Sequence, residues 1–349
     1  MFDKLIKIGR YDISINNPTF LIAEIGSNFD GSFDRAKKLI KDAKDCGAQV
    51  AKFQSFKTEK IISANNFGKS SFQKNWDQSV GEVYKSAEFP LDWMLELKQY
   101  TEELGLEFMS SPYDLNALDE LVKIGVSCIK IGSGEISNPE FLKLAAETKL
   151  PIILATGAAS LSEIDEAMNI FDKSRNSKII LLQCITQYPT QFQYANIRTI
   201  ETYRQTYGCI VGYSDHTPGL AVPLGSVALG ARVIEKHFTD DKSRKGPDHP
   251  FAMDLLDFKE MSEQIRNLEK ALGNSWKKIE ACEEETIILQ RRGLVTTQKI
   301  YKGEPITKEN STLLRPQKGI LPKDVQNVLG KMLNKDLDAE TPIRWEDIT

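Results

Sequence analysis

The chain has 349 residues, of which 41% are hydrophobic and 27% charged, a balance that is ordinary for a soluble globular protein and excludes collagen-like and largely disordered chains. Its 45 basic and 49 acidic residues give a formal net charge of −4, so we expect no nucleic-acid partner. A mildly acidic chain can still hold a local basic pocket for a small anion. The length allows one large domain with a small one, or two to three ordinary domains.

The five cysteines are widely spaced, and no pair has the C-x-x-C spacing. A disulfide framework or a structural zinc site is therefore not expected, and a cytoplasmic location is the simplest reading. The first 17 residues mix basic and acidic side chains without a long apolar stretch, so no secretory signal is predicted. No apolar run reaches the roughly 18 residues that would predict a membrane span.

Short apolar runs alternate with longer amphipathic stretches from about residue 18 to residue 272. The runs are rich in Val, Ile and Leu without polar alternation, which is typical of strands buried on both faces. We predict eight such strands, at residues 19–24, 49–54, 107–110, 128–131, 151–155, 178–184, 209–213 and 232–237.

The amphipathic stretches between these runs predict helices, most of which stop at a glycine, the residue favoured at helix C-termini. The clearest are residues 35–46, 91–104, 115–124, 161–171, 219–229 and 256–272. Eight strands, each followed by a plausible helix within about 255 residues, predict an α/β fold of the (β/α)8 TIM-barrel class. An open doubly wound sheet is the alternative, but its polar residues would gather at one switch point rather than end nearly every strand.

Two other segments stand out. The connection at residues 55–89 is too long for an ordinary loop, and we interpret it as a lid or a substrate-recognition insertion. Its polar stretch contains Asn65, Asn66, Gly68, Lys69, Ser70 and Ser71. Beyond the barrel, predicted for residues 1–272, the texture changes to a charged linker at 273–290 and a small domain of short strands and turns at 291–349. A domain of about 60 residues is marginally stable alone, so we expect it to dock on the barrel or on a partner subunit.

Polar side chains stand at the ends of nearly all the predicted strands, where TIM barrels carry their active sites. They include Glu24, Lys52, Gln54, Ser110, Lys130, Ser133, Glu135, Thr156, Thr186, Tyr188, Ser214, Asp215, His216, Glu235 and His237. The two-residue period of a strand lets Lys52 and Gln54 face the barrel interior together.

Lysines inside a barrel must meet negative charge. One reading is structural, with the lysines paired to Glu24 or Glu235. The functional reading is an anionic ligand, most simply a phosphate held by Lys52, Lys130 and the turn at Ser133.

The chain has only three histidines, and two of them, His216 and His237, end adjacent predicted strands. Their rings can converge on a divalent metal, with coordination positions left for water and substrate. The alternative is a pair of hydrogen-bonded histidines without a metal. Ligand type alone would favour Zn or Fe over Mn or Mg.

Taken together, eight motifs occur in an order and spacing that resemble the sialic acid synthase family, which includes the N-acetylneuraminate, legionaminate and pseudaminate synthases. The motifs are Ala-Glu-Ile-Gly at 23–26, Lys-Phe-Gln at 52–54, Lys-Ile-Gly-Ser-Gly-Glu at 130–135, Ala-Thr-Gly at 155–157, Tyr-Pro-Thr at 188–190, Ser-Asp-His at 214–216, Glu-Lys-His-Phe-Thr at 235–239 and Gly-Pro-Asp-His at 246–249. The C-terminal segment, with Leu-Arg-Pro at 314–316, resembles that family's antifreeze-like (SAF) domain.

The resemblance implies a TIM barrel joined to an antifreeze-like domain, and an enzyme that condenses phosphoenolpyruvate with an N-acetylmannosamine-type sugar, releasing phosphate. It implies a divalent cation on His216 and His237, usually Mn²⁺, with Mg²⁺ or Co²⁺ as alternatives, which replaces the softer metals favoured above. The other roles that it implies are phosphoenolpyruvate binding by Lys52, Lys130, Ser133 and Ser214, catalysis by Glu24 and Glu135, and sugar binding by Gln54, Tyr188, Asp248 and Arg315.

The resemblance further implies a domain-swapped homodimer in which Arg315 reaches the sugar's N-acyl group in the partner's site. Ser-Gly-Glu at 133–135 is closer to the neuraminate and legionaminate branches, but Ala155 and Thr186 depart from some relatives and leave the sugar open. Two other functions remain as alternatives. One is a phosphoenolpyruvate aldol-type synthase acting on a sugar phosphate, and the other is a non-catalytic sugar-binding protein on the same scaffold.

Overall fold

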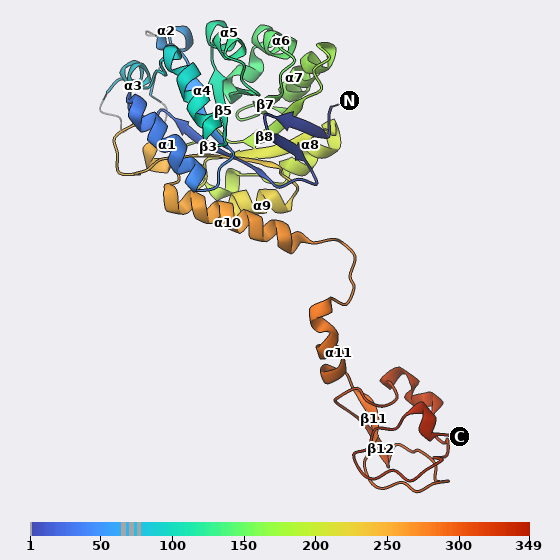
Figure 1. Ribbon diagram of the computed structural model, residues 1–349. Helices are drawn as coiled ribbons and strands as arrows, with labels where there is room; N and C mark the ends of the chain where they lie inside the picture. Colours follow the sequence, from blue (N-terminus) through green and yellow to red (C-terminus); the bar gives the residue numbers. More distant parts are fainter. Residues whose placement is uncertain (1, 64–67, 70–72, 75–77) are drawn as a thin grey trace. The chain divides into compact units, whose positions relative to one another are not determined.

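The computed structural model describes residues 2–63, 68–69, 73–74 and 78–349 (Figure 1). The chain forms two compact units, Met1–Gly273 and Asn274–Thr349. Of the polar residues noted in the long insertion, Asn65, Asn66, Ser70 and Ser71 lie outside the described residues. The lid interpretation therefore stays a prediction.

Eight parallel strands form the centre of the first unit. They are β3 (Phe20–Gly26), β4 (Val50–Ser55), β5 (Glu107–Pro112), β6 (Ile129–Ile131), β7 (Ile152–Ala155), β8 (Ile179–Cys184), β9 (Ile210–Asp215) and β10 (Val233–His237). They hydrogen-bond in the order β5-β4-β3-β10-β9-β8-β7-β6, and the two outer strands of that order, β5 and β6, contact each other. The sheet is thus a nearly closed barrel, and each strand begins within one residue of its predicted start. The predicted fold class is confirmed, and the doubly wound alternative is wrong because the first and last strands pair.

Helices surround this barrel (Figure 1). The six predicted helices are present as α1 (Phe33–Asp45), α4 (Met94–Glu103, after the 3₁₀ turn η2 at Leu91–Trp93), α5 (Leu115–Lys123), α7 (Leu161–Lys173), α9 (Ala221–Ala228) and α10 (Leu255–Leu272). Four helices lack a residue range in the prediction, namely α2 (Thr58–Ile61), α3 (Val80–Ser86), α6 (Pro139–Glu147) and α8 (Thr199–Tyr207). For α6 the start signal is clear in hindsight, since Asn138 caps the helix by accepting the Phe141 N–H and proline occupies the next position.

A two-stranded antiparallel hairpin that the sequence analysis did not predict, β1 (Leu5–Ile8) and β2 (Tyr11–Ser14), precedes the barrel. Its buried side chains Ile6, Ile8 and Ile13 pack against the first residues of the barrel strands, including Phe20 and Val233. The hairpin therefore covers the N-terminal end of the barrel with apolar surface.

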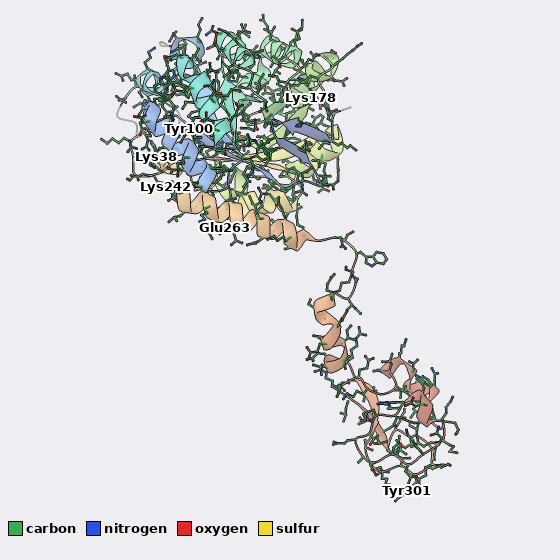
Figure 2. The ribbon with its side chains drawn as sticks, in the orientation of Figure 1. Lys38, Tyr100, Lys178, Lys242, Glu263 and Tyr301 are labelled. Atoms are coloured by element: carbon green, nitrogen blue, oxygen red, sulfur yellow. The ribbon has the colours of Figure 1, made fainter. Side chains whose placement is uncertain are left out.

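The outer faces of the helices are polar. Figure 2 shows long charged side chains such as Lys38, Lys178 and Lys242 projecting from the first unit. Lys38 contacts Asp42 at 2.6 Å within α1 and Asp240 at 3.3 Å, and such exposed pairs contribute little stability. Among the described residues, no helix is both long enough and apolar enough to cross a membrane.

The second unit begins with a 3₁₀ turn and a short helix, η6 (Ala281–Glu283) and α11 (Glu284–Gln290), and continues with the antiparallel strands β11 (Gly293–Thr296) and β12 (Ser311–Leu314), η7 (Pro322–Asn327) and η8 (Trp345–Asp347). Its small core consists of Leu294, Ile300, Ile306, Ile320, Val328, Leu333, Leu337 and Ile343. The backbone passes so close at Gly319 that an added Cβ would lie 2.2 Å from the Leu294 carbonyl oxygen. Glycine is therefore required there.

Candidate active site

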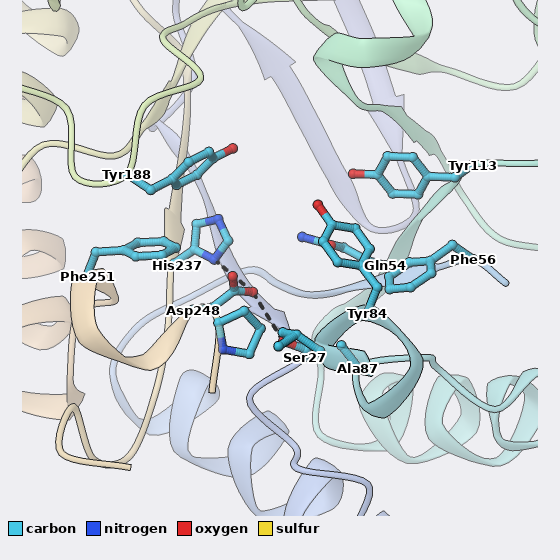
Figure 3. A pocket seen from close by; sticks show the side chains of 12 residues that line it. Ser27, Gln54, Phe56, Tyr84, Ala87, Tyr113, Tyr188, His237, Asp248 and Phe251 are labelled. Carbon is cyan, nitrogen blue, oxygen red and sulfur yellow. Dashed lines mark hydrogen bonds and ion pairs between the residues drawn. The ribbon is translucent and has the colours of Figure 1, made fainter. Parts of the chain in front are cut away.

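Two adjoining cavities open at the carboxyl ends of the barrel strands. The lysine cavity, of about 130 Å³, is lined by Glu24, Lys52, Gln54, Ser111, Tyr113, Lys130, Gly132, Ser133, Gly134, Ala155, Cys184, Thr186, Tyr188, Ser214, His216, Glu235 and His237. The tyrosine cavity, of about 150 Å³, is lined by Ser27, Gln54, Phe56, Val83, Tyr84, Ala87, Tyr113, Tyr188, His237, Pro247, Asp248 and Phe251 (Figure 3). Four residues, Gln54, Tyr113, Tyr188 and His237, line both and mark where the cavities meet.

The lysine cavity contains four buried charged side chains in contact. Lys52 donates a hydrogen bond to Glu24, and its Nζ lies 3.4 Å from Glu235 Oε1. The Nζ of Lys130 lies 3.2 Å from the same Glu235 oxygen. The structural reading of these lysines, ion pairs with the two glutamates, is therefore present. It leaves room for an anion, because both ammonium groups also line the cavity.

The two glutamates differ in electrostatic environment. Burial alone would raise the pKa of both. For Glu235 the nearby Lys130 and Lys52 outweigh burial and lower the pKa to about 2, whereas burial raises the pKa of Glu24, with Glu235 adding to the rise and Lys52 opposing it. The carboxyl group of Glu24 is thus the more easily protonated of the two, which is a property of a group that exchanges a proton during a reaction.

The two histidines on neighbouring strands β9 and β10 have ring centroids 5.4 Å apart. The Nδ1 atom of His216 lies 2.7 Å from the Ile185 carbonyl oxygen, which can only accept, so Nδ1 carries the proton. Burial, with help from His237, lowers the pKa of His216 to about 3. The ring is therefore neutral, and its Nε2 lone pair is available to a metal.

This pair fits a cation that takes two protein nitrogens. Within the described part of the chain, no group of three or more His, Cys, Asp or Glu side chains is arranged to hold a metal. Water and substrate oxygens would complete the coordination shell, as in catalytic sites with open positions. The ring of His237 is held from the other side by Asp248, whose Oδ2 lies 3.5 Å from Nδ1 (Figure 3).

Aromatic rings form much of the tyrosine cavity. Figure 3 shows Tyr84, Tyr113 and Tyr188 around it, with Phe56 and Phe251 at opposite sides. Two of its lining residues, Val83 and Tyr84, come from α3, so the C-terminal part of the long insertion contributes to the site. Aromatic faces beside a few hydrogen-bonding groups are typical of pockets for sugar-sized ligands.

Ten of the twelve predicted site residues line one or both cavities. They are Glu24, Lys52, Gln54, Lys130, Ser133, Tyr188, Ser214, His216, His237 and Asp248. Glu135 lies in η3 (Ser133–Ser137), half-buried, with Oε2 accepting a hydrogen bond from Asn138 at 3.4 Å, and it is not among the described residues that line either cavity. Arg315 is an exposed residue of the second unit, directly after β12.

Several lining residues have no role in the sequence analysis. Tyr113 directly follows β5 and stands three residues beyond Ser110, the candidate named at that strand end, and Tyr84 lies in an insertion without a predicted helix. Glu235 is predicted at a strand end and as a partner for lysines, but it is given no catalytic or binding role. Its position two residues before His237 on one strand was the signal that could have placed it in the site.

Comparison with known proteins identifies the family. The NeuB family model matches residues 39–277, and the SAF domain model matches residues 291–349. The chain belongs to the NeuB family. An N,N'-diacetyllegionaminic acid synthase from Legionella pneumophila is 38% identical over 94% of this chain and 94% of its own length.

Two further relatives cover almost the whole length. An N-acetylneuraminate-9-phosphate synthase from Mus musculus is 33% identical over 97% of this chain and 95% of its own. The crystal structure of an N-acetylneuraminic acid (sialic acid) synthetase from Leptospira borgpetersenii, in complex with citrate, superposes with a TM-score of 0.73 at 34% identity, covering 82% of this chain and 96% of that one. This chain is accordingly an enzyme of the sialic-acid-type synthase class.

Proposed function

We propose that the enzyme condenses phosphoenolpyruvate with N-acetylmannosamine, or with a related 2-acetamido or 2,4-diacetamido-trideoxy hexose, to form a nine-carbon 2-keto acid and phosphate. The observation that carries the proposal is the pair of adjoining cavities, one with buried ammonium groups and one walled by tyrosines, with two imidazoles beside their junction. A phosphorylated acid suits the first cavity and an uncharged amino sugar the second. The names of the relatives, an N,N'-diacetyllegionaminic acid synthase and an N-acetylneuraminate-9-phosphate synthase, support a product of the sialic acid type.

Phosphoenolpyruvate would bind in the lysine cavity. Lys52 and Lys130 supply charge for its phosphate and carboxylate. The Ser133 hydroxyl accepts the Gly157 N–H at 2.9 Å, which leaves its own proton to donate to an anion. Ser214, which donates to Glu235 at 3.1 Å, stands on the neighbouring side of the same cavity.

The reaction joins C3 of phosphoenolpyruvate to the sugar's aldehyde carbon, which leaves an alkoxide on the sugar and a cationic C2. Water then adds to C2 and gives one proton to a base, and its second proton leaves as the C2 hydroxyl becomes a ketone and the C–O bond to phosphate breaks. One of these two protons converts the sugar alkoxide to a hydroxyl, and the other departs with phosphate. We assign the acceptance of the water proton to Glu24, whose pKa is raised by burial and which lines the cavity. For Glu135, which does not line either cavity among the described residues, the catalytic role stays a prediction from the resemblance.

A divalent cation held by His216 and His237, Mn²⁺ by the family resemblance, would polarise the aldehyde and stabilise the negative charge that develops on its oxygen. Gln54, Tyr188 and Asp248 would bind the sugar beside it. From the resemblance we also propose a cytoplasmic enzyme that forms a domain-swapped homodimer, with Arg315 of one subunit completing the other's sugar site. Light scattering would measure the mass of the assembly.

The test is phosphate release from phosphoenolpyruvate, measured with Mn²⁺ across a panel of amino sugars that includes N-acetylmannosamine, its 6-phosphate and 2,4-diacetamido-trideoxy hexoses. Sugar-dependent phosphate release with an uncharged amino sugar is the expected result. Release only with the 6-phosphate would support the alternative of a sugar-phosphate synthase. Sugar binding without any phosphate release would support the non-catalytic alternative.

A further inference from the structure

Tyr113 occupies a distinctive place in the site. It follows β5 directly and is one of the four residues that line both cavities. Its ring packs edge-on against Phe56 at 6.0 Å, and in Figure 3 its hydroxyl points across the tyrosine cavity toward the side where Tyr188 stands. The phenol therefore spans the boundary between the place proposed for the acid and the place proposed for the sugar.

The hydroxyl of Tyr113 is available to a ligand. None of the hydrogen bonds among the described residues involves it, whereas the buried hydroxyls of Tyr203 and Tyr213 bond to Gln183 and to the Ala195 carbonyl. Burial, and then the charge of Glu24, raises the pKa of Tyr113 well above its usual range. The group is thus a neutral phenol that carries a proton to donate.

The turn at Gly132 leaves space for the ring of Tyr113. A Cβ added to Gly132 would lie 3.1 Å from the Tyr113 hydroxyl oxygen and 3.3 Å from two ring carbons. The backbone of Gly132 has an ordinary negative φ of −67°, which does not call for glycine, and its three nearest contacts for an added Cβ are all to the phenol of Tyr113. The missing side chain at Gly132 lets the phenol reach the junction.

We infer that Tyr113 is a substrate-contacting residue, whose hydroxyl donates a hydrogen bond to an oxygen at the reacting end of the amino sugar. The inference rests on the proposed function and adds to it a specific donor at the junction of the two cavities. The carbon–carbon bond forms where the two substrates meet, and Tyr113 is the phenol that follows a barrel strand on the side of the junction opposite Tyr188 and His237 (Figure 3). A donor at that point helps to orient the aldehyde for attack.

The experiment compares wild-type protein with Tyr113→Phe, which keeps the ring and removes the hydroxyl. In steady-state phosphate release, the KM for the sugar should rise and kcat should fall, so that kcat/KM for the sugar drops by about tenfold, the size of one lost hydrogen bond. The KM for phosphoenolpyruvate should change by less than about twofold. Tyr207→Phe is the matched control, since that hydroxyl bonds to Asp165 on α7, and it should leave all constants unchanged. Unchanged constants in Tyr113→Phe, or a rise confined to the KM for phosphoenolpyruvate, would overturn the inference.

A second variant tests the same contact without touching the phenol. Gly132→Ala should displace the ring and shift the sugar constants in the same direction, and it should have a smaller effect in the Tyr113→Phe background, where the tightest contact is gone. Gly81→Ala is its control, because a Cβ there meets nothing within 4 Å. Equal effects of Gly132→Ala in both backgrounds would contradict the contact.

Calorimetric titration of N-acetylmannosamine and the diacetamido sugars into protein saturated with phosphoenolpyruvate separates this inference from the proposed function. Wild-type protein that binds a sugar without phosphate release would overturn the proposed function, and weaker binding by Tyr113→Phe would still support the contact. Equal binding by the two proteins would overturn the contact, and wild-type protein that binds no sugar would overturn both.

Discussion

The two ends of the barrel are built from the same eight strands and differ in chemistry. At the N-terminal end, Ile22, Val50, Cys128 and Val233 belong to one apolar cluster with the buried side chains of the hairpin. A few residues further along the same strands, the inward positions hold Glu24, Lys52, Lys130 and Glu235. Period-two alternation is kept throughout, so only the side-chain type changes along each strand.

This contrast shows how the barrel separates stability from function. Burial of the apolar end stabilises the fold by the hydrophobic effect. Burial of four charged side chains at the other end costs solvation free energy that their mutual contacts only partly recover. The charged end is therefore present for what it binds, and its variants should affect activity and stability in different proportions from variants of the apolar end.

The largest expected effect is on activity, at the charged end. His216→Ala should lower metal-dependent kcat by about 1,000-fold, roughly 4 kcal/mol in activation free energy, because one of two protein nitrogens for the cation is lost. The urea midpoint of EDTA-treated protein should change far less. Mn²⁺ titration followed by electron paramagnetic resonance measures the lost affinity directly. Full wild-type activity after exhaustive EDTA treatment would contradict the metal assignment.

The next effect is on stability, at the apolar end. Ile153→Ala, at a fully buried position on β7, should destabilise the protein by about 2–4 kcal/mol through lost burial and a cavity. Urea unfolding measures this change, and kcat per folded molecule should stay at the wild-type value. Leu256→Ala, at a position 80% exposed on α10, is the control and should shift stability by less than about 0.5 kcal/mol. A large loss of kcat in Ile153→Ala would break the separation between the two ends.

Acid should weaken the fold through the charged end. The pKa of His216 is about 3 in the folded protein and 6.5 in the unfolded chain. Between pH 6.5 and 3 the unfolded chain therefore binds a proton at this residue that the folded protein does not bind. Its contribution to stability is thus complete above pH 6.5 and is lost progressively as the pH falls toward 3. Glu235, with a pKa of about 2 against 4.5, adds a loss in the same direction below pH 4.5. Urea midpoints of EDTA-treated protein from pH 7 to pH 4 measure the slope, which His216→Gln should flatten between pH 6.5 and 4.5. An identical slope in the variant would rule out this origin.

The smallest expected effect is on the KM for the sugar, and it tests whether the site extends beyond the barrel. Arg315→Ala should raise the KM for the sugar by about tenfold, equivalent to 1.4 kcal/mol, if the exposed guanidinium binds the N-acyl group. Neither the KM for phosphoenolpyruvate nor the urea midpoint should move. Lys323→Ala, an exposed residue in the same unit, serves as the control. An unchanged KM for the sugar would restrict the site to the barrel.

The barrel was predictable because buried strands have a simple signature. Apolar runs such as residues 179–184 are rich in β-branched and aliphatic residues and too short for a typical buried helix, which indicates strands. Eight such strands at helix-length spacing leave few topologies. The hairpin at residues 5–14 escaped prediction because each of its strands has only four residues, the lower limit for a recognisable alternation of apolar and polar positions. The aromatic wall of the site also escaped, because Tyr84 reaches it from an irregular insertion whose path no periodic pattern fixes.

The charged residues of the site were predictable as candidates, but their pairing was not. Strand ends place Glu24, Lys52 and Glu235 at one rim, yet sequence cannot say which carboxylate a lysine contacts. The structure gives Glu235 two ammonium neighbours and Glu24 one, and this difference decides which carboxyl group is more easily protonated. A local sequence pattern contains no information on how many ammonium groups surround a carboxylate in the folded protein.

The pairing of β3 with β10 also constrains how the protein is made. Glu24 and His237 are register partners, although they come from opposite ends of the barrel unit's sequence. A ribosome must therefore finish almost the whole unit before its first barrel strand meets its last neighbour. Until then Lys52 lacks its contact with Glu235, and Glu24 lacks its register partner His237. A nascent chain halted before residue 233 therefore contains the first half of the site without the strand that completes it.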